Sequence, residues 1–177
     1  MAKTLITYFG TYGTTEKFAK DIAELTGGDL FEIEPVKPYD KDTAHYEELA
    51  EYAKKERDND ERPAIKTLPN VADYDYIFIG YPMWWYTYPQ IIRTFIESVD
   101  LNGKTIIPFN THEVSGNAGT YNILKSKMTG ATLKGDGFNK SGSTARTDDG
   151  IKNLDNWLSG LGFNWRENGV LDAERTV

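Results

Sequence analysis

Short apolar runs alternate with stretches of helical periodicity along nearly the whole of this 177-residue chain. The apolar runs are rich in β-branched and aromatic residues, as buried strands are, and lie at residues 5–9, 30–33, 76–80 and 104–109. Apolar residues at helical spacing occur in the intervening stretches, at 18–25, 40–62, 90–99, 117–128 and 151–161. Parallel strands need such crossover helices, so the alternation predicts an α/β fold: a parallel sheet with helices on both faces.

Two local signals refine this prediction. A fifth strand is expected within 131–138, although two glycines weaken it. Thr87 and Gln90, with Pro89 between them, have the spacing of a capping box at the start of the third helix. Residues 1–162 are expected to form one domain, and the polar tail 163–177 is assigned no structure.

Composition and charge exclude several classes of protein. The 39% hydrophobic content is enough to build a core, so disorder throughout is excluded. The chain contains no cysteine, which excludes disulfides, thiolate zinc sites and iron–sulfur clusters. With only two histidines, far apart in the sequence, we predict no metal site. A net charge of −7 disfavours nucleic acid and anionic membrane as partners.

Nothing near the N-terminus has the pattern of a signal peptide, and no apolar stretch approaches the length of a membrane span. We therefore expect a cytoplasmic protein. The sequence leaves the oligomeric state, including a homodimer, open.

Ligands of an open parallel sheet bind beyond the carboxyl ends of its strands, so the loops after the first, third and fourth strands are examined for function. The first loop offers two glycines, three threonine hydroxyls and a helix N-terminus, but no Lys or Arg before Lys17. It is suited to a phosphate held by uncharged donors. A simple turn with a threonine N-cap is the alternative. The residues are Gly10, Thr11, Tyr12, Gly13, Thr14 and Thr15.

The second loop, residues 81–86, contains four aromatic side chains, a proline and a methionine. Two adjacent tryptophans cannot easily point the same way, so we expect one in the core and one free to meet a flat ligand. The third loop, 110–119, is rich in small and hydrogen-bonding residues. It contains His112, which acts either as a structural hydrogen-bonding group or as a proton donor.

Other phosphate and nucleophile motifs are absent from the sequence. There is no GxxxxGK[ST] and no GxGxxG, and the third strand ends in Gly80 rather than a phosphoacceptor aspartate. No serine lies in a nucleophile-elbow motif.

The three loops, in this order on an alternating chain, resemble those of the flavodoxins. The similarity is greatest to bacterial flavodoxin-like proteins with a Gly-Tyr-Pro-x-Trp-Trp segment, here 80–85, and a Thr-His-x-x-Ser-Gly segment, here 111–116. It covers about residues 2–162. The resemblance implies a three-layer sandwich whose five-stranded sheet has the order 2-1-3-4-5, with FMN at the point where the order reverses.

The resemblance also implies roles for individual residues. The first loop, Gly10 to Thr15, would bind the FMN phosphate. Two groups would border the isoalloxazine ring: Pro82, Met83, Trp84 and Trp85 on one side, and Thr111, His112, Glu113, Ser115 and Gly116 on the other. Flavodoxins commonly place a glycine-containing turn beside the flavin, whereas 82–86 contains none, so we expect two-electron chemistry to be favoured.

Three functions are compatible with this sequence. The first is an FMN-dependent electron carrier that docks to redox partner proteins. The second is an NAD(P)H-dependent reductase of quinones or similar acceptors, with His112 as a proton donor. The third is a binding module that has kept the fold and lost the cofactor. In the first two, a low potential for the last electron is expected, because a net acidic protein and a stacked tryptophan disfavour a second negative charge on the ring.

Overall fold

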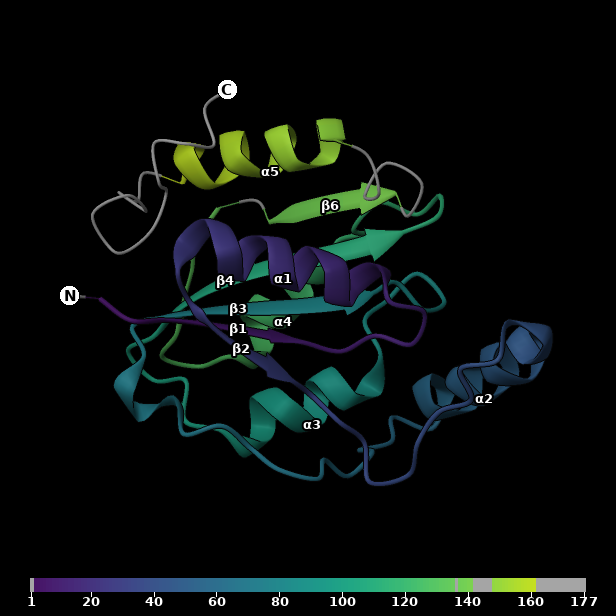
Figure 1. Cartoon of the computed structure of the whole chain (residues 1–177). Coiled ribbons are helices and arrows are strands. Elements are labelled where there is room, and N and C mark those ends of the chain that lie inside the picture. Colours follow the sequence, from purple (N-terminus) through teal and green to yellow (C-terminus); the bar gives the residue numbers. More distant parts are fainter. Residues whose placement is uncertain (1, 136, 142–147, 162–177) are drawn as a thin grey trace.

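The computed structural model describes residues 2–135, 137–141 and 148–161, and the predicted tail 163–177 lies outside them. The strands form one parallel sheet with the order β2-β1-β3-β4-β5, and β6 pairs with β4 (Figure 1). The strands are β1 (Thr4–Tyr8), β2 (Asp29–Glu32), β3 (Tyr76–Pro82), β4 (Thr105–His112), β5 (Thr132–Leu133) and β6 (Phe138–Ser141). The predicted fold class and strand order are confirmed.

The fifth position of the sheet differs from the prediction, because it is shared by two short strands. Leu133 of β5 pairs with Ile106, and Phe138 of β6 pairs with Phe109. Between these two pairs the chain advances by five residues from β5 to β6 but by only three residues along β4. Gly135 and Gly137, which lie between the two short strands, have φ angles of 74° and 72°. The two glycines that weakened the prediction thus interrupt the strand.

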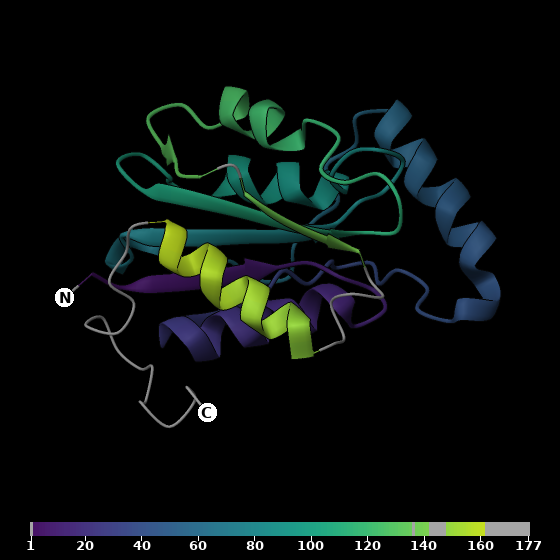
Figure 2. The same cartoon turned by 90° about the horizontal axis from the view of Figure 1, so that it is seen from above.

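Four helices cover the two faces of the sheet (Figures 1 and 2). Helices α1 (Thr14–Thr26) and α5 (Asp148–Gly160) pack on one face, where Phe18, Ile22 and Leu158 lie in the same buried cluster as the strand residues Ile6 and Phe78. Helices α3 (Gln90–Ser98) and α4 (Thr120–Lys127) cover the other face. Neighbouring residues of β1 and β3 enter opposite clusters, as the two-residue period of a strand requires.

Helix α2 (Tyr46–Asp58) belongs to neither layer. It follows the 3₁₀ turn Thr43–His45 and stands beyond the sheet, on the side toward which the strands point (Figures 1 and 2). A second 3₁₀ turn, Val71–Asp73, precedes β3. The amphipathic helix predicted within 40–62 is present, but it is shorter than that range. Among the described residues, no helix is both long and apolar enough to cross a membrane.

The predicted capping box before α3 is wrong. Pro89 is the N-cap residue of this helix, and no side chain caps it. Thr87 is instead paired with Trp84 through two backbone hydrogen bonds, N to O of 2.9 and 3.1 Å. Thr87, the residue that the capping box would need, is therefore part of a tight turn.

Candidate functional site

A cavity of about 480 Å³ lies at the carboxyl ends of β1, β3 and β4, and α2 forms one of its walls. Among the described residues, three predicted site residues, Gly10, Gly13 and Gly116, are outside its lining. The other twelve are brought together there: Thr11, Tyr12, Thr14, Thr15, Pro82, Met83, Trp84, Trp85, Thr111, His112, Glu113 and Ser115. The three loops predicted from the sequence therefore meet at one site.

The glycines of the first loop shape its backbone. Gly13 is the N-cap residue of α1 and has a φ of 83°, a conformation that favours glycine, so the alternative of a threonine N-cap is wrong. A Cβ at Gly10 would lie 3.2 Å from the Cβ of Thr15, closer than most such contacts. The first N–H groups of α1 have no partner within the helix and can serve an anion.

The threonines of this loop divide into two groups. The hydroxyls of Thr15 and Thr111 are hydrogen-bonded to each other, with 2.9 Å between the two Oγ1 atoms, in a buried position. This bond ties the start of α1 to the end of β4. Thr11 and Thr14 line the same cavity and are the remaining threonines of the first loop.

The two tryptophans of the second loop have different surroundings, as expected. Trp84 packs edge-to-face against Phe9 and Tyr39, with ring centroids 5.3 and 5.2 Å apart, and joins the core. Trp85 lines the cavity and is 38% exposed. Trp85 and Tyr86 are the central residues of the tight turn and have φ angles of 53° and 61°, as in a type I′ turn. A loop without glycine thus adopts left-handed backbone at two bulky residues.

The third loop is held from within. The side-chain amide of Asn110 donates to the carbonyl of Gly116 at 3.1 Å, so Gly116 supports the loop from outside the cavity. The backbone N–H of Met83 donates to the carbonyl of Thr111 at 2.8 Å, which joins the second and third loops. His112 lines the cavity, and its Nδ1 atom is buried with no hydrogen-bond partner. A buried ring nitrogen in this condition favours a ligand group that would satisfy it.

Six lining residues were not predicted from the sequence, and four of them lie on α2: Tyr46, Leu49, Ala50, Ala53, Tyr86 and Val114. The periodic apolar stripe of residues 46–53 was visible in the sequence. Its spacing shows which face of the helix is apolar, but it does not show what that face meets. The helix expected within 40–62 is therefore a wall of the site.

Hydrogen bonds hold α2 against the second loop. The indole Nε1 of Trp85 donates to the carbonyl of Ala50 at 2.7 Å, and Arg57 donates to the carbonyl of Trp85 at 3.2 Å. Further along the helix the carboxylate of Glu56, which is 3% exposed, accepts a hydrogen bond from the hydroxyl of Tyr39, 2.8 Å from the nearer oxygen. Burial raises the pKa of Glu56, and Tyr39 only partly opposes this effect.

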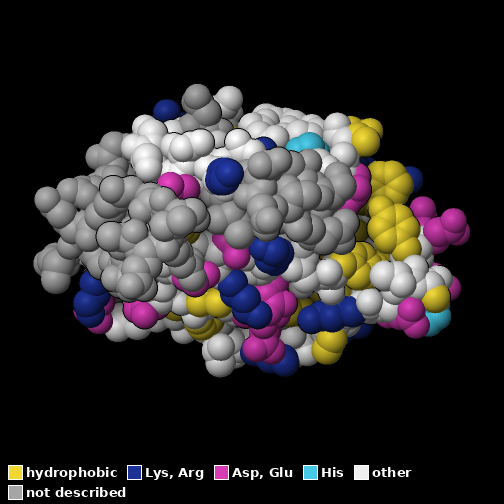
Figure 3. Space-filling model, turned by 45° about the horizontal axis from the view of Figure 1, so that its top comes forward, with side chains coloured by type: hydrophobic (Ala, Val, Ile, Leu, Met, Phe, Trp, Pro, Cys, Tyr) yellow, Lys and Arg dark blue, Asp and Glu magenta, His cyan; other side chains and the backbone are white. Residues whose placement is uncertain are grey.

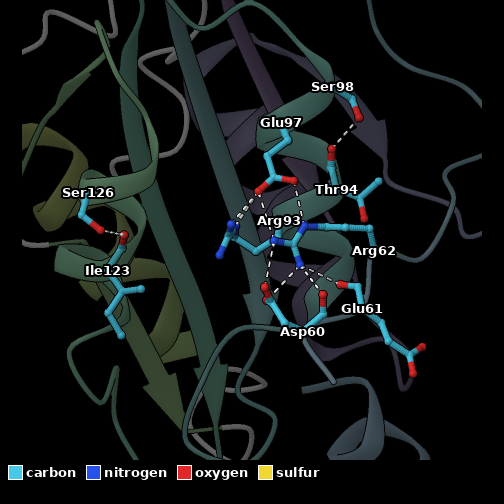
Figure 4. Close-up of polar contacts among 9 residues, drawn as sticks. All are labelled: Asp60, Glu61, Arg62, Arg93, Thr94, Glu97, Ser98, Ile123 and Ser126. Atoms are coloured by element: carbon cyan, nitrogen blue, oxygen red, sulfur yellow. Dashed lines mark hydrogen bonds and ion pairs between the residues drawn. The ribbon is translucent and has the colours of Figure 1, made fainter. Parts of the chain in front are cut away.

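An ion-pair network holds the segment after α2 to α3 (Figure 4). Arg62 contacts Glu97 at 2.7 Å and Asp60 at 2.9 Å, and Arg93 contacts Glu97 at 2.6 Å. The paired arginines lower the pKa of Glu97. The middle of α2, its C-terminal end and the segment that follows it are thus connected to the body of the molecule.

The described lining of the cavity contains no Lys or Arg, and Glu113 is its one acidic residue. Burial, followed by the nearby Tyr46 and Asp40, raises the pKa of Tyr12, so its hydroxyl stays protonated and able to donate. The site therefore combines uncharged donors at the α1 end with aromatic and apolar walls. Such a lining fits a ligand that carries both an anionic group and a planar ring.

This fold and this site define a class, and comparison with known proteins identifies it. A flavodoxin family model matches residues 3–159, nearly the whole chain. The chain belongs to the flavodoxin family. A search of curated proteins finds no match.

Solved structures agree with this assignment. A candidate flavoprotein from Bacteroides eggerthii DSM 20697 is 34% identical, with 93% of this chain and 100% of that chain covered and a TM-score of 0.79. One from Bacteroides uniformis ATCC 8492 is also 34% identical, with 89% and 98% covered and a TM-score of 0.76. A Lactobacillus acidophilus flavoprotein in complex with FMN is 22% identical, with 89% and 99% covered and a TM-score of 0.66. This last likeness shows the fold.

Proposed function

We propose that this protein binds FMN in the cavity and uses it for electron transfer. The observation that carries the proposal is the composition of the cavity: hydroxyl donors and a helix N-terminus at one end, tryptophans in the wall, and no cation in the described lining. Membership of the flavodoxin family and the FMN complex of the Lactobacillus acidophilus relative support it.

The residues fit the cofactor in two ways. Thr11 and Thr14, with the first N–H groups of α1, would hold the phosphate without a Lys or Arg. His112 and the exposed part of Trp85, both in the lining, would face the ring system. When bound, the flavin would supply the redox chemistry.

The protein's own residues would then orient the cofactor and control its surroundings. The hydrogen bond between Thr15 and Thr111 fixes the phosphate loop relative to β4, and the bond between Met83 and Thr111 fixes the aromatic loop to the same strand. Strand β4 would therefore hold the proposed phosphate site and the proposed ring site at a constant separation. Glu113, the acidic residue of the lining, adds negative charge beside the ring and disfavours a further negative charge on it.

Titration of the apoprotein with FMN and with riboflavin tests this function. We expect FMN to bind more tightly, because riboflavin lacks the phosphate. Thr14→Ala should weaken FMN by at least about tenfold, the value of one hydrogen bond to a charged group, and leave riboflavin unchanged. Thr67→Ala, at an exposed threonine outside the lining, is the matched control. An apoprotein that takes up neither flavin would refute the proposal.

The position of Trp85 gives a second readout. Trp85→Ala should weaken both flavins to a similar extent, by about two- to tenfold, because ring contact does not depend on the phosphate. It should also reduce the quenching of flavin fluorescence. Equal affinity and equal fluorescence in wild type and variant would show that the ring lies elsewhere.

A further inference from the structure

One stripe of α2 supports the side chain of Trp85, the partly exposed tryptophan of the cavity lining. The indole Nε1 donates to the carbonyl of Ala50 at 2.7 Å. The charged groups of Lys54 and Arg57 lie over the ring, 5.5 and 5.8 Å from its centroid. These three helix residues follow one another at steps of four and three positions, so they share one face of α2.

The contacts with α2 fix the position of the Trp85 ring. Its φ of 53° lies in a region that few residues other than glycine adopt, and Arg57 donates to its carbonyl at 3.2 Å. Figure 3 shows hydrophobic side chains gathered on the side of the molecule where α2 lies, with acidic and basic side chains beside them. A flat ligand on Trp85 would therefore meet a ring whose position relative to Lys54 is set by the helix.

The two cations over this ring differ in how far their charge is balanced. The guanidinium of Arg57 is paired with the carboxylate of Asp58, with 2.7 Å between Nη2 and Oδ1. Such a pair has a small net field at a distance. Lys54 takes part in none of the ion pairs found among the described residues. Lys54 is therefore the unbalanced positive charge beside Trp85.

This charge is near enough to act on a ligand in the cavity. Stacked aromatic rings lie at most about 7 Å apart between centroids, so a ring stacked on Trp85 would lie within about 13 Å of the Lys54 ammonium. Over such a distance one unit charge changes the binding of another by about two- to tenfold in low salt. The described lining contains no Lys or Arg, and Lys54 itself lies outside it.

We propose that Lys54 makes the site prefer reduced FMN, whose ring is an anion, over oxidised FMN, whose ring is neutral. This inference rests on the proposed function. Lys54 is not a catalytic residue, because it acts on the flavin across the Trp85 ring. Its effect opposes that of Glu113 in the lining, so the potential of the last electron is higher than the acidic group alone would make it.

The preference is measured by binding, without turnover. Calorimetric titration of the apoprotein with oxidised FMN, and anaerobically with chemically reduced FMN, gives two dissociation constants at mildly alkaline pH and low salt. Their ratio isolates the charge on the ring, because both forms carry the same phosphate. Lys54→Gln should weaken reduced FMN about two- to tenfold more than oxidised FMN, and added salt should diminish this difference.

Two further variants distinguish charge from structure. Lys55→Gln is the matched control, because it makes the same change in net charge at an exposed residue about 100° further around the helix. It should leave the ratio of the two dissociation constants nearly unchanged. Lys54→Arg keeps a cation over the indole and should have the ratio of the wild type.

The outcomes separate this inference from the proposed function. An apoprotein that binds neither form of FMN overturns both. If FMN binds but Lys54→Gln changes the ratio no more than Lys55→Gln does, the role of Lys54 is overturned and the FMN site stands. The same holds if Lys54→Gln weakens both forms equally, since the lysine would then only support the Trp85 ring. A ratio in Lys54→Arg equal to that in Lys54→Gln would also overturn it.

Discussion

Gly80 and Phe109 face each other across β3 and β4, just before the two loops of the candidate site begin. A Cβ added at Gly80 would lie 2.0 Å from the Phe109 ring, which is 1% exposed and cannot move toward solvent. The glycine of the Gly-Tyr-Pro segment is therefore required by packing. It allows the aromatic ring of one strand to lie on the backbone of the next.

We predict that Gly80→Ala lowers the free energy of unfolding by about 1–3 kcal/mol, the usual cost of overpacking a core. Urea unfolding followed by circular dichroism measures it. Gly160→Ala, where nothing lies within 4 Å of the added Cβ, is the matched control and should not lower the free energy of unfolding. Equal stability of Gly80→Ala and wild type would show that the Phe109 ring can relax.

Tyr86 presents the opposite case, a bulky residue in a conformation suited to glycine. Its φ is 61° and its side chain is 68% exposed, so strain at this residue is offset by little packing. We predict that Tyr86→Gly unfolds with a free energy about 1 kcal/mol higher than Tyr86→Ala, since alanine keeps the strained Cβ. Thermal and urea unfolding of the two variants measure the difference. A lower stability for the glycine variant would contradict it.

At the scale of elements, the buried carboxylate of Glu56 joins α2 to Tyr39 through a hydrogen bond. Burial raises the pKa of Glu56 above its usual value of 4.5, with a smaller contribution from Glu61. Because of this raised pKa, the Glu56 carboxyl binds its proton more tightly in the folded protein than in the unfolded chain. The free energy of unfolding should therefore fall as the pH rises from about 4.5 through the raised pKa.

Glu56→Gln keeps a side-chain oxygen for Tyr39 and removes the charge. We predict that the difference in unfolding free energy, variant minus wild type, increases with pH over this window and then levels off. Glu51→Gln, an exposed glutamate of the same helix, should show no such trend. Urea unfolding at a series of pH values decides it, and parallel curves for wild type and Glu56→Gln would reject it.

The secondary-structure elements also differ in how well they could be predicted from the sequence. The strands could be predicted because apolar runs in a parallel sheet are short and buried on both faces. The place of α2 could not, because this helix stands outside the two helical layers, and periodicity alone does not identify what the Leu49 and Ala53 stripe packs against. The turn at Trp85 and Tyr86 could not be predicted either, since neither residue type indicates a left-handed backbone.

At the scale of the whole molecule, the net charge of the protein has the same sign as the phosphate of the proposed cofactor. The protein carries a net charge of −7, and the described cavity lining contains no cation. If local hydrogen bonds and the helix dipole hold the phosphate, added salt screens mainly the repulsion between an acidic protein and an anionic ligand.

We therefore predict that FMN affinity rises with ionic strength, by up to about threefold between low and physiological salt. Riboflavin, which lacks the phosphate, should bind with an affinity that salt hardly changes. Calorimetric titrations of both flavins over a series of salt concentrations measure this contrast. An FMN affinity that falls as salt is added would mean that lysine or arginine holds the phosphate, and the charge-free phosphate site inferred from the threonine loop would then be wrong.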